Sequence, residues 1–144
     1  MIRTEKTILI DRPIEDVFDY LADFKNDMQW RSELAEIRQT TGFARGQGAR
    51  YEQRLTWGDR EADADFEVVE YEPNRHIGFR GSSGSLSARG DYELDAEDGR
   101  TRLRVVGELE LSGVLEAAEE MIGDAVQRAG EEDLRHLKDI LESR

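Results

Sequence analysis

The feature that most constrains this chain is a run of five alternating segments between Tyr51 and Leu111. A period of two places successive side chains on opposite faces of a strand. The pattern therefore predicts an antiparallel meander of five strands with one apolar and one charged face. In the first two segments, the residues assigned to the inner face are Tyr51, Gln53, Leu55 and Trp57, then Ala62, Ala64, Phe66 and Val68.

Charged residues allow the pairing of the first two strands to be predicted. A two-residue turn at positions 58–59, with glycine first, sets Arg54 opposite Asp63 and Arg50 opposite Glu67. Opposite charges then meet on the outer face, and the apolar residues stay together on the inner face.

The same reasoning gives a register for the later strands. Each pairing brings opposite charges together on the outer face and small or apolar residues together on the inner face. The predicted pairs are Val68 with Ile77, Asp65 with Arg80, Leu94 with Thr101, Glu93 with Arg102, and Ala88 with Gly107.

A short helix is predicted before the meander. Apolar residues at the i, i+3, i+4, i+7 spacing begin at Ile14, directly after a proline, whose missing N–H suits a first helical turn. The pattern frays after Leu21, although Phe24, Met28 and Trp30 continue to supply apolar side chains. We therefore expect a two-turn helix followed by a broken, aromatic-rich segment.

The chain after the meander, residues 112–144, predicts one long amphipathic helix. Gly123 and Gly130 each cost such a helix roughly 1 kcal/mol relative to alanine, and Gly130 is the expected place for a bend. Packing against the apolar face of the sheet would hold the helix together. Its apolar stripe comprises Leu115, Ala118, Ile122, Ala125, Val126, Ala129, Leu134, Leu137 and Leu141.

Composition excludes several classes of function. The 144 residues include no cysteine, which rules out disulfides, thiolate metal sites and cysteine nucleophiles. There are 33 acidic and 20 basic residues, and the formal net charge of −13 disfavours nucleic acid and anionic membranes as partners. No stretch resembles a signal peptide or reaches the length of a membrane span, so we expect a cytoplasmic protein. We also expect neither a metal nor another cofactor.

The order of strand, short broken helices, long meander and long C-terminal helix resembles the helix-grip fold of the START/Bet v 1-like superfamily. Within it the chain is similar to the polyketide cyclase/dehydrase and lipid-transport group, also called SRPBCC. The resemblance covers nearly the whole chain, so we expect a single domain over residues 1–144. It rests on "ILIDRPIEDVFDYLADFKNDMQW", "GQGARYE", "VVEYEPNRHIGFR" and "DGRTRLRVVGELELSG".

The resemblance implies an α+β fold in which the long helix closes a curved antiparallel sheet into a cup. Two short helices would support one end of that sheet. Phe24, Met28 and Trp30 would then plug the cup or line its entrance, or else seal the edge of the sheet.

Two observations on the residues themselves favour a cavity. Small residues, including Ala62, Ala64, Ala88, Gly90 and Gly107, recur on the inner face, and the helix opposite offers further alanines. Missing side-chain volume would leave a pocket, because interiors normally avoid voids. The alternative is close packing of the helix on the sheet.

The second observation is a set of polar atoms on the otherwise apolar inner face. Buried polar groups need partners, which a ligand, water or backbone carbonyls could supply. The predicted ligand-binding residues are Trp30, Tyr51, Gln53, Leu55, Trp57, Ala64, Phe66, Phe79, Ala88, Tyr92, Val105, Ala118 and Ile122.

No catalytic residue can be assigned from the sequence. We expect His76 and His136 to be solvated, and neither has a neighbour that would make it a base for a nucleophile. The alternating acids Asp63, Asp65 and Glu67 are expected to be paired with arginines on the surface rather than to bind a metal.

The sequence therefore predicts a protein that binds a small, largely apolar ligand, lipid-like or of polyketide or aromatic character. One alternative is a polyketide cyclase or aromatase that folds its substrate by confinement, with a tyrosine or Gln53 polarising a carbonyl. A second is a protein-interaction module, similar to co-chaperone or toxin members of the superfamily. The oligomeric state, monomer or weak homodimer, stays open.

Overall fold

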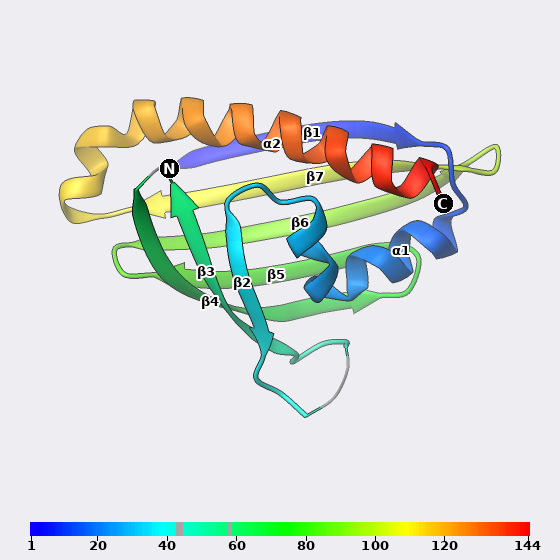
Figure 1. Cartoon of the computed structure of the whole chain (residues 1–144), viewed down its shortest axis with the longest axis horizontal. Coiled ribbons are helices and arrows are strands. Elements are labelled where there is room, and N and C mark those ends of the chain that lie inside the picture. The colour runs from blue at the N-terminus through cyan, green and yellow to red at the C-terminus, as the bar shows by residue number, and fades with distance from the viewer. Residues whose placement is uncertain (43–44, 58) are drawn as a thin grey trace.

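A computed structural model shows one antiparallel sheet with a long helix lying across one side (Figure 1). It describes residues 1–42, 45–57 and 59–144, and for Trp57 and Arg60 the backbone alone. The strands are β1 (Ile2–Ile10), β2 (Leu34–Gln39), β3 (Arg50–Trp57), β4 (Arg60–Glu72), β5 (His76–Ser83), β6 (Leu86–Glu97) and β7 (Arg100–Leu111). The helices are α1 (Ile14–Ala22), the 3-10 helices η1 (Phe24–Gln29) and η2 (Gly113–Ala118), and α2 (Glu119–Glu142).

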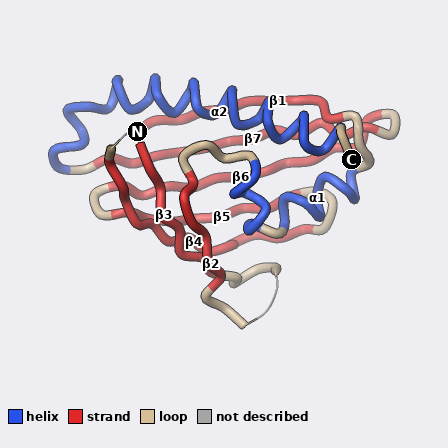
Figure 2. The backbone as a smooth tube through the Cα atoms, viewed as in Figure 1, coloured by secondary structure: helices blue, strands red, loops and turns tan. Residues whose placement is uncertain are grey.

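The sheet has the strand order β1-β7-β6-β5-β4-β3-β2, so the meander from β3 to β7 forms its centre. The first strand pairs with the last, and β1 and β2 are the two edges. Figure 2 shows the two short helical segments, α1 and η1, beside the same sheet face that α2 covers. The predicted α+β helix-grip architecture is confirmed.

The two-turn helix and the broken segment after it are also confirmed. In α1, Val17, Phe18 and Leu21 are buried, as the apolar spacing predicts. The Asp23 carboxylate then accepts a hydrogen bond from the Lys25 backbone N–H at 3.2 Å and begins the 3-10 helix η1. This local side-chain bond competes with continuation of the α-helix.

The predicted register of β3 and β4 is confirmed. Arg54 lies opposite Asp63 and Arg50 opposite Glu67, with ion-pair distances of 3.3 and 2.7 Å. The predicted turn residue Gly58 lies outside the described residues.

The predicted register of β6 and β7 is wrong by two residues. Leu94 pairs with Leu103 rather than Thr101, because the connection is a two-residue turn at Asp98-Gly99 and not a longer loop. Both turn residues have positive φ, 55° and 80°, as this kind of hairpin turn requires. A shift of two keeps every side chain on its predicted face. The altered pairs are Glu93 with Arg104, Asp95 with Arg102, Ala88 with Leu109, and Gly90 with Gly107.

The predicted register of β4 and β5 is wrong for a related reason. Val68 pairs with Phe79 rather than Ile77, and Arg80 lies opposite Glu67 rather than Asp65. The pairing shifts between Val68 and Glu70, where β4 is irregular. A bulge of this kind adds a residue to one strand, and simple alternation does not reveal it.

The long C-terminal helix is confirmed, with η2 as its first turns. The helix α2 runs unbroken through both glycines, and these face β1. A Cβ atom on Gly130 would lie 3.2 Å from Lys6 Cε, and one on Gly123 would lie 3.8 Å from Ile2. An added Cβ would therefore crowd the Lys6 side chain at Gly130, whereas Gly123 has room for one. In the described residues no helix is long and apolar enough to cross a membrane.

Candidate ligand-binding site

The inner face of the sheet is filled at one end by an aromatic cluster centred on Phe24. This ring, 1% exposed, lies 5.3 Å from Tyr51, 5.1 Å from Phe66 and 5.6 Å from Phe79 between ring centroids. Tyr92 stacks beside it at 6.4 Å. Phe24 therefore plugs this end of the cup, which is one of the roles expected for the aromatic segment. We call this end, which α1, η1 and the C-terminal turns of α2 cover, the filled half.

Two polar groups inside the filled half lack a hydrogen bond of standard geometry. The Tyr51 hydroxyl is buried without a hydrogen bond. The Trp30 indole N–H makes no hydrogen bond of standard geometry, but it lies close enough to the Asp27 carboxylate to lower the pKa of that group. Burial raises the pKa of Tyr51 to about 12 and raises that of Tyr92 further. Both phenols therefore stay protonated near neutral pH and can donate a hydrogen bond.

The other end of the inner face is not filled, and we call it the open half. Its side chains are half exposed although they lie on the apolar face. From the sheet these residues are Leu55, Ala62, Ala64, Ala88, Gly107 and Leu109, and from α2 they are Ile122 and Val126. The sheet and α2 thus leave part of this apolar surface accessible to solvent.

Gly90 and Gly107, two glycines predicted on the inner face, have different neighbours in the structure. A Cβ on Gly90 would lie 2.4 Å from the Phe79 ring, so Gly90 makes room for an aromatic side chain. At Gly107 the only described neighbour of an added Cβ is Thr4 Oγ1, at 3.1 Å. Close packing, the alternative to a cavity, therefore explains Gly90.

An ion pair marks the border between the two halves. Arg31 Nη1 donates to Asp27 Oδ2 at 3.3 Å and to Gln53 Oε1 at 3.2 Å. Asp27 is 1% exposed, and its other oxygen makes no hydrogen bond of standard geometry, although the Trp30 indole N–H lies near the carboxylate. Burial raises the pKa of Asp27 to about 7, although the nearby Arg31 guanidinium favours the charged form. Asp27 can therefore lose or gain a proton near neutral pH.

The loop after η1 fixes this ion pair to α2. The Ser32 backbone N–H donates to Asp133 Oδ1 at 3.1 Å, and Asp133 is 6% exposed. Thr56 N–H donates to Glu33 O at 2.8 Å and joins the same loop to β3. The residues that follow Arg31 are thus hydrogen-bonded to α2 on one side and to β3 on the other.

The structure brings together four of the predicted ligand-binding residues, Tyr51, Phe66, Phe79 and Tyr92, within the filled half. Trp30 is also buried at that end, and Val105 packs at its border. Gln53 and Ala64 lie opposite each other on β3 and β4. The side chain of Trp57 lies outside the described part of the chain. Half-buried positions elsewhere are Leu55, Ala88, Ala118 and Ile122.

A recess of about 1040 Å³ at the edge of the sheet has a different character. It borders β2, β3, β4 and the turn after β5, and of the predicted residues it includes Gln53 and Ala64. Its lining is mainly polar and includes six charged residues, which does not suit an apolar ligand. The charged residues are Glu36, Arg38, Glu52, Arg54, Asp63 and Asp65.

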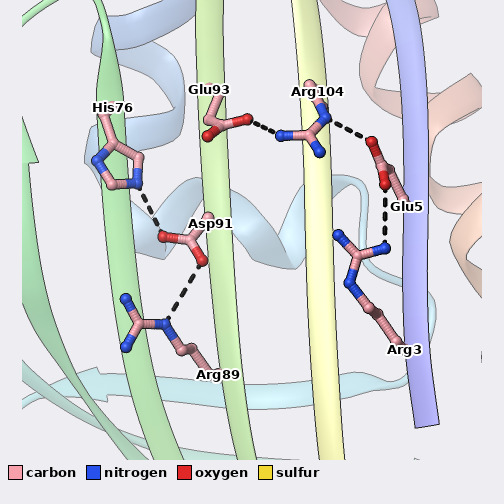
Figure 3. A network of polar contacts seen from close by, with 7 residues as sticks. All are labelled: Arg3, Glu5, His76, Arg89, Asp91, Glu93 and Arg104. Atoms are coloured by element: carbon pink, nitrogen blue, oxygen red, sulfur yellow. Dashed lines mark hydrogen bonds and ion pairs between the residues drawn. The ribbon is translucent and has the colours of Figure 1, made fainter.

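His76 is not solvated as predicted. On the outer face its ring nitrogens lie 3.0 Å from Glu70 and 2.8 Å from Asp91, and its side chain is 20% exposed. Figure 3 shows Asp91 between His76 and Arg89, beside a second ionic chain along β6, β7 and β1. The prediction failed because the β4 irregularity brings Glu70 within reach. His136 is exposed on α2.

Two of the three alternating acids, Asp63 and Glu67, are paired with arginines as expected, whereas Asp65 is not. Asp63 contacts Arg54, Glu67 contacts Arg50, and Asp65 accepts from Ser82. Within the described ranges, no three His, Asp or Glu side chains are grouped so as to hold a metal ion.

Sequence reasoning missed Asp27, Arg31 and Asp133. The i, i+4 spacing of Asp27 and Arg31 was visible, and it permits an ion pair on one helical turn. Nothing in the local sequence shows that this turn faces the interior. The distant Asp133 could be found only once the loop and α2 are placed together.

The curved seven-stranded sheet with a long helix across it is the helix-grip fold. The family model described as "Polyketide cyclase / dehydrase and lipid transport" matches residues 1–142. The chain therefore belongs to the polyketide cyclase/dehydrase and lipid-transport family. The comparison with curated protein sequences gave no match.

Solved structures support the same fold. The Zhui aromatase/cyclase from Streptomyces sp. R1128 superposes with a TM-score of 0.85 at 18% identity, over 99% of this chain and 94% of that one. TTHA0849 from Thermus thermophilus gives 0.80 at 14% identity, over 98% and 97%. Ara h 8.0201 gives 0.75 at 14% identity, over 99% and 98%. At such identities the likeness establishes the fold alone.

Proposed function

We propose that the protein binds a small, largely apolar molecule, lipid-like or of polyketide or aromatic character, between the inner face of the sheet and α2. The proposal rests mainly on the open half, where apolar residues of the sheet and of α2 remain half exposed. Apolar surface removed from water gains about 25 cal/mol per Å². A ligand lying there would gain this free energy from both walls at once.

The family supports this proposal, because its description includes lipid transport. The polar border supports it as well. Ligand sites are commonly apolar walls with a few placed polar groups, and Gln53 and Arg31 supply such groups beside the open half.

Native mass spectrometry of the protein as purified tests the proposal directly. A co-purified small molecule, released on denaturation, is the expected result. A second test is titration with an uncharged fluorescent apolar probe, such as the methyl ester of pyrenebutanoic acid. A protein that carries no small molecule and binds no such probe at micromolar concentration would contradict the proposal.

One observation favours a second candidate, a cyclase-type enzyme. Asp27 has a pKa near neutrality and contacts Arg31, and general acid–base catalysis works best with such a group. The Zhui protein, which shares the fold, is named an aromatase/cyclase. Turnover of a poly-β-carbonyl substrate, lost on Asp27→Asn, would establish this candidate; binding without turnover would exclude it for that substrate.

A further inference from the structure

Arg31 uses only part of its guanidinium group within the protein. Both of its hydrogen bonds come from Nη1. Among the described residues, no oxygen accepts a hydrogen bond from its Nε or Nη2. These two nitrogens form one edge of the group with nearly parallel N–H bonds, and such an edge binds a carboxylate through two hydrogen bonds. The side chain is 22% exposed, so this edge is not sealed inside the core.

The charge of Arg31 is only partly compensated by the protein. Asp27 is its one carboxylate partner within 4 Å among the described residues. Because burial raises the pKa of Asp27 to about 7, this partner is protonated, and therefore neutral, in part of the molecules near neutral pH. A largely buried cation whose counter-charge is incomplete is unfavourable, so an anion from outside would be stabilised here.

The other groups facing Arg31 do not take the place of that anion. Tyr92 stays neutral because burial raises its pKa. Asp133 already accepts the Ser32 N–H, and burial together with Asp133 raises the pKa of Glu33. Neither carboxylate lies within ion-pair distance of Arg31.

Apolar surface begins directly beside the ion pair. Gln53, which Arg31 contacts, lies opposite Ala64, and the next inward pair along the same strands is Leu55 with Ala62. All four side chains are half exposed. A molecule with its polar end at Arg31 could therefore extend along the open half.

We infer that the ligand is a carboxylic acid with an apolar body, whose carboxylate binds the Nε/Nη2 edge of Arg31 while the body lies along the open half. This inference rests on the proposed function and adds the chemistry of the ligand. An aliphatic acid and an aromatic acid share this chemistry.

The test compares a matched acid and ester. Pyrenebutanoic acid and its methyl ester have the same apolar body, and pyrene fluorescence reports binding of both to the full chain. We expect the wild type to bind the acid about ten- to hundredfold more tightly, as a charge-assisted pair of hydrogen bonds would give. Displacement by dodecanoate or by naphthoate then distinguishes an aliphatic from an aromatic preference.

Two variants locate the effect. Arg31→Met removes the guanidinium and keeps an apolar stem, so the preference for the acid should vanish while ester affinity stays within about twofold. Arg54→Met, on the outer face with carboxylate partners at 3.3 and 3.6 Å, is the control and should keep the preference. If Arg31→Met does not fold, Arg31→Lys keeps the charge without the two-donor edge and should lose most of the preference.

The outcomes separate this inference from the proposed function. Equal binding of acid and ester by the wild type overturns the inference and leaves the proposed function standing. An acid preference that persists in Arg31→Met or in Arg31→Lys also overturns the inference. Binding of neither probe overturns both.

Discussion

The two halves of the inner face are built from the same strands and differ in what covers them. On β6, Tyr92 and Gly90 lie under Phe24 and Phe79 in the filled half, whereas Ala88, two residues before Gly90, stays half exposed. In the filled half a small residue makes room for a neighbouring aromatic ring, whereas in the open half a small residue stays partly accessible to solvent. A small residue therefore does not indicate a cavity until the side chain above it is known.

The covering elements explain the difference. Three elements, α1, η1 and the end of α2, place buried side chains on the filled half. Earlier in α2, Ile122 and Val126 are only half buried, and both glycines of the helix face β1 rather than the centre of the sheet. Stability is thus expected to come mainly from one half, and ligand binding from the other.

The largest expected effect is on Phe24, the centre of the filled half. Phe24→Ala should lower the free energy of unfolding by about 3–5 kcal/mol, because it removes a buried ring and leaves a cavity among four others. Denaturant unfolding measures this loss. Met28→Ala, on the same short helix with a side chain 45% exposed, is the control and should cost less than about 1 kcal/mol. Similar losses for both would mean that the aromatic end is not tightly packed.

Asp27 makes the stability of the filled half depend on pH. Between about pH 4 and pH 7 the folded protein holds the Asp27 proton while the unfolded chain has lost it, so this residue's contribution to stability falls as pH rises. Relative to wild type, Asp27→Asn should gain about 2–3 kcal/mol between pH 5 and pH 8. Unfolding of both proteins at several pH values isolates the residue from other carboxylates. A difference that stays constant with pH would show that the pKa of Asp27 is not raised.

Substitutions at neighbouring inward positions of β6 compare the halves directly. Gly90→Ala places a Cβ against the Phe79 ring and should cost about 1–3 kcal/mol. Ala88→Leu adds more atoms but extends them over the open half, so the unliganded protein should be unchanged or slightly stabilised. Thermal unfolding gives both values.

The same alanine tests ligand binding. A leucine at position 88 should weaken binding of an apolar probe, and with it the stabilisation that the probe confers. Marked destabilisation of the empty Ala88→Leu protein would mean that the open half is closely packed after all.

The smallest effect is expected from the histidines, which lie outside both halves. Replacing His76 and His136 together with glutamine should leave binding of the apolar probe within about twofold, since His76 contacts Glu70 and Asp91 on the outer face. Fluorescence titration measures this. Loss of turnover by orders of magnitude in a cyclase assay on the same variant would favour an enzyme whose chemistry uses the outer face.

Most of the fold could be predicted because alternation and helical spacing are local signals. The pairing of Arg54 with Asp63 was found from a two-residue turn signal and matching charges. The two wrong registers arose where local geometry decided: the left-handed Asp98-Gly99 turn and the irregularity between Val68 and Glu70. The Asp98-Gly99 dipeptide is itself a strong hairpin signal, so the first error was avoidable.

The site was less predictable because it depends on which side chains fill the inner face. The contact of Arg31 with Gln53 joins two elements 22 residues apart, and that of Ser32 with Asp133 spans 101 residues. Charged residues such as Arg31 are ordinarily exposed. Only the packing of η1 against β2 and β3 brings this one to the border of the cup.

The pairing of β1 with β7 has a consequence for how the chain acquires its shape. Ile10 meets Thr101 and Ile2 meets Leu109, so the first strand gains its partner only when nearly the whole meander exists. Loop-closure entropy makes such distant pairings slow relative to hairpins between adjacent strands. During synthesis on the ribosome, β1 therefore emerges long before β7, the strand with which its backbone pairs, has been made. The charged side chains of β1, which include Arg3, Glu5 and Lys6, disfavour pairing of this unpaired strand with other chains.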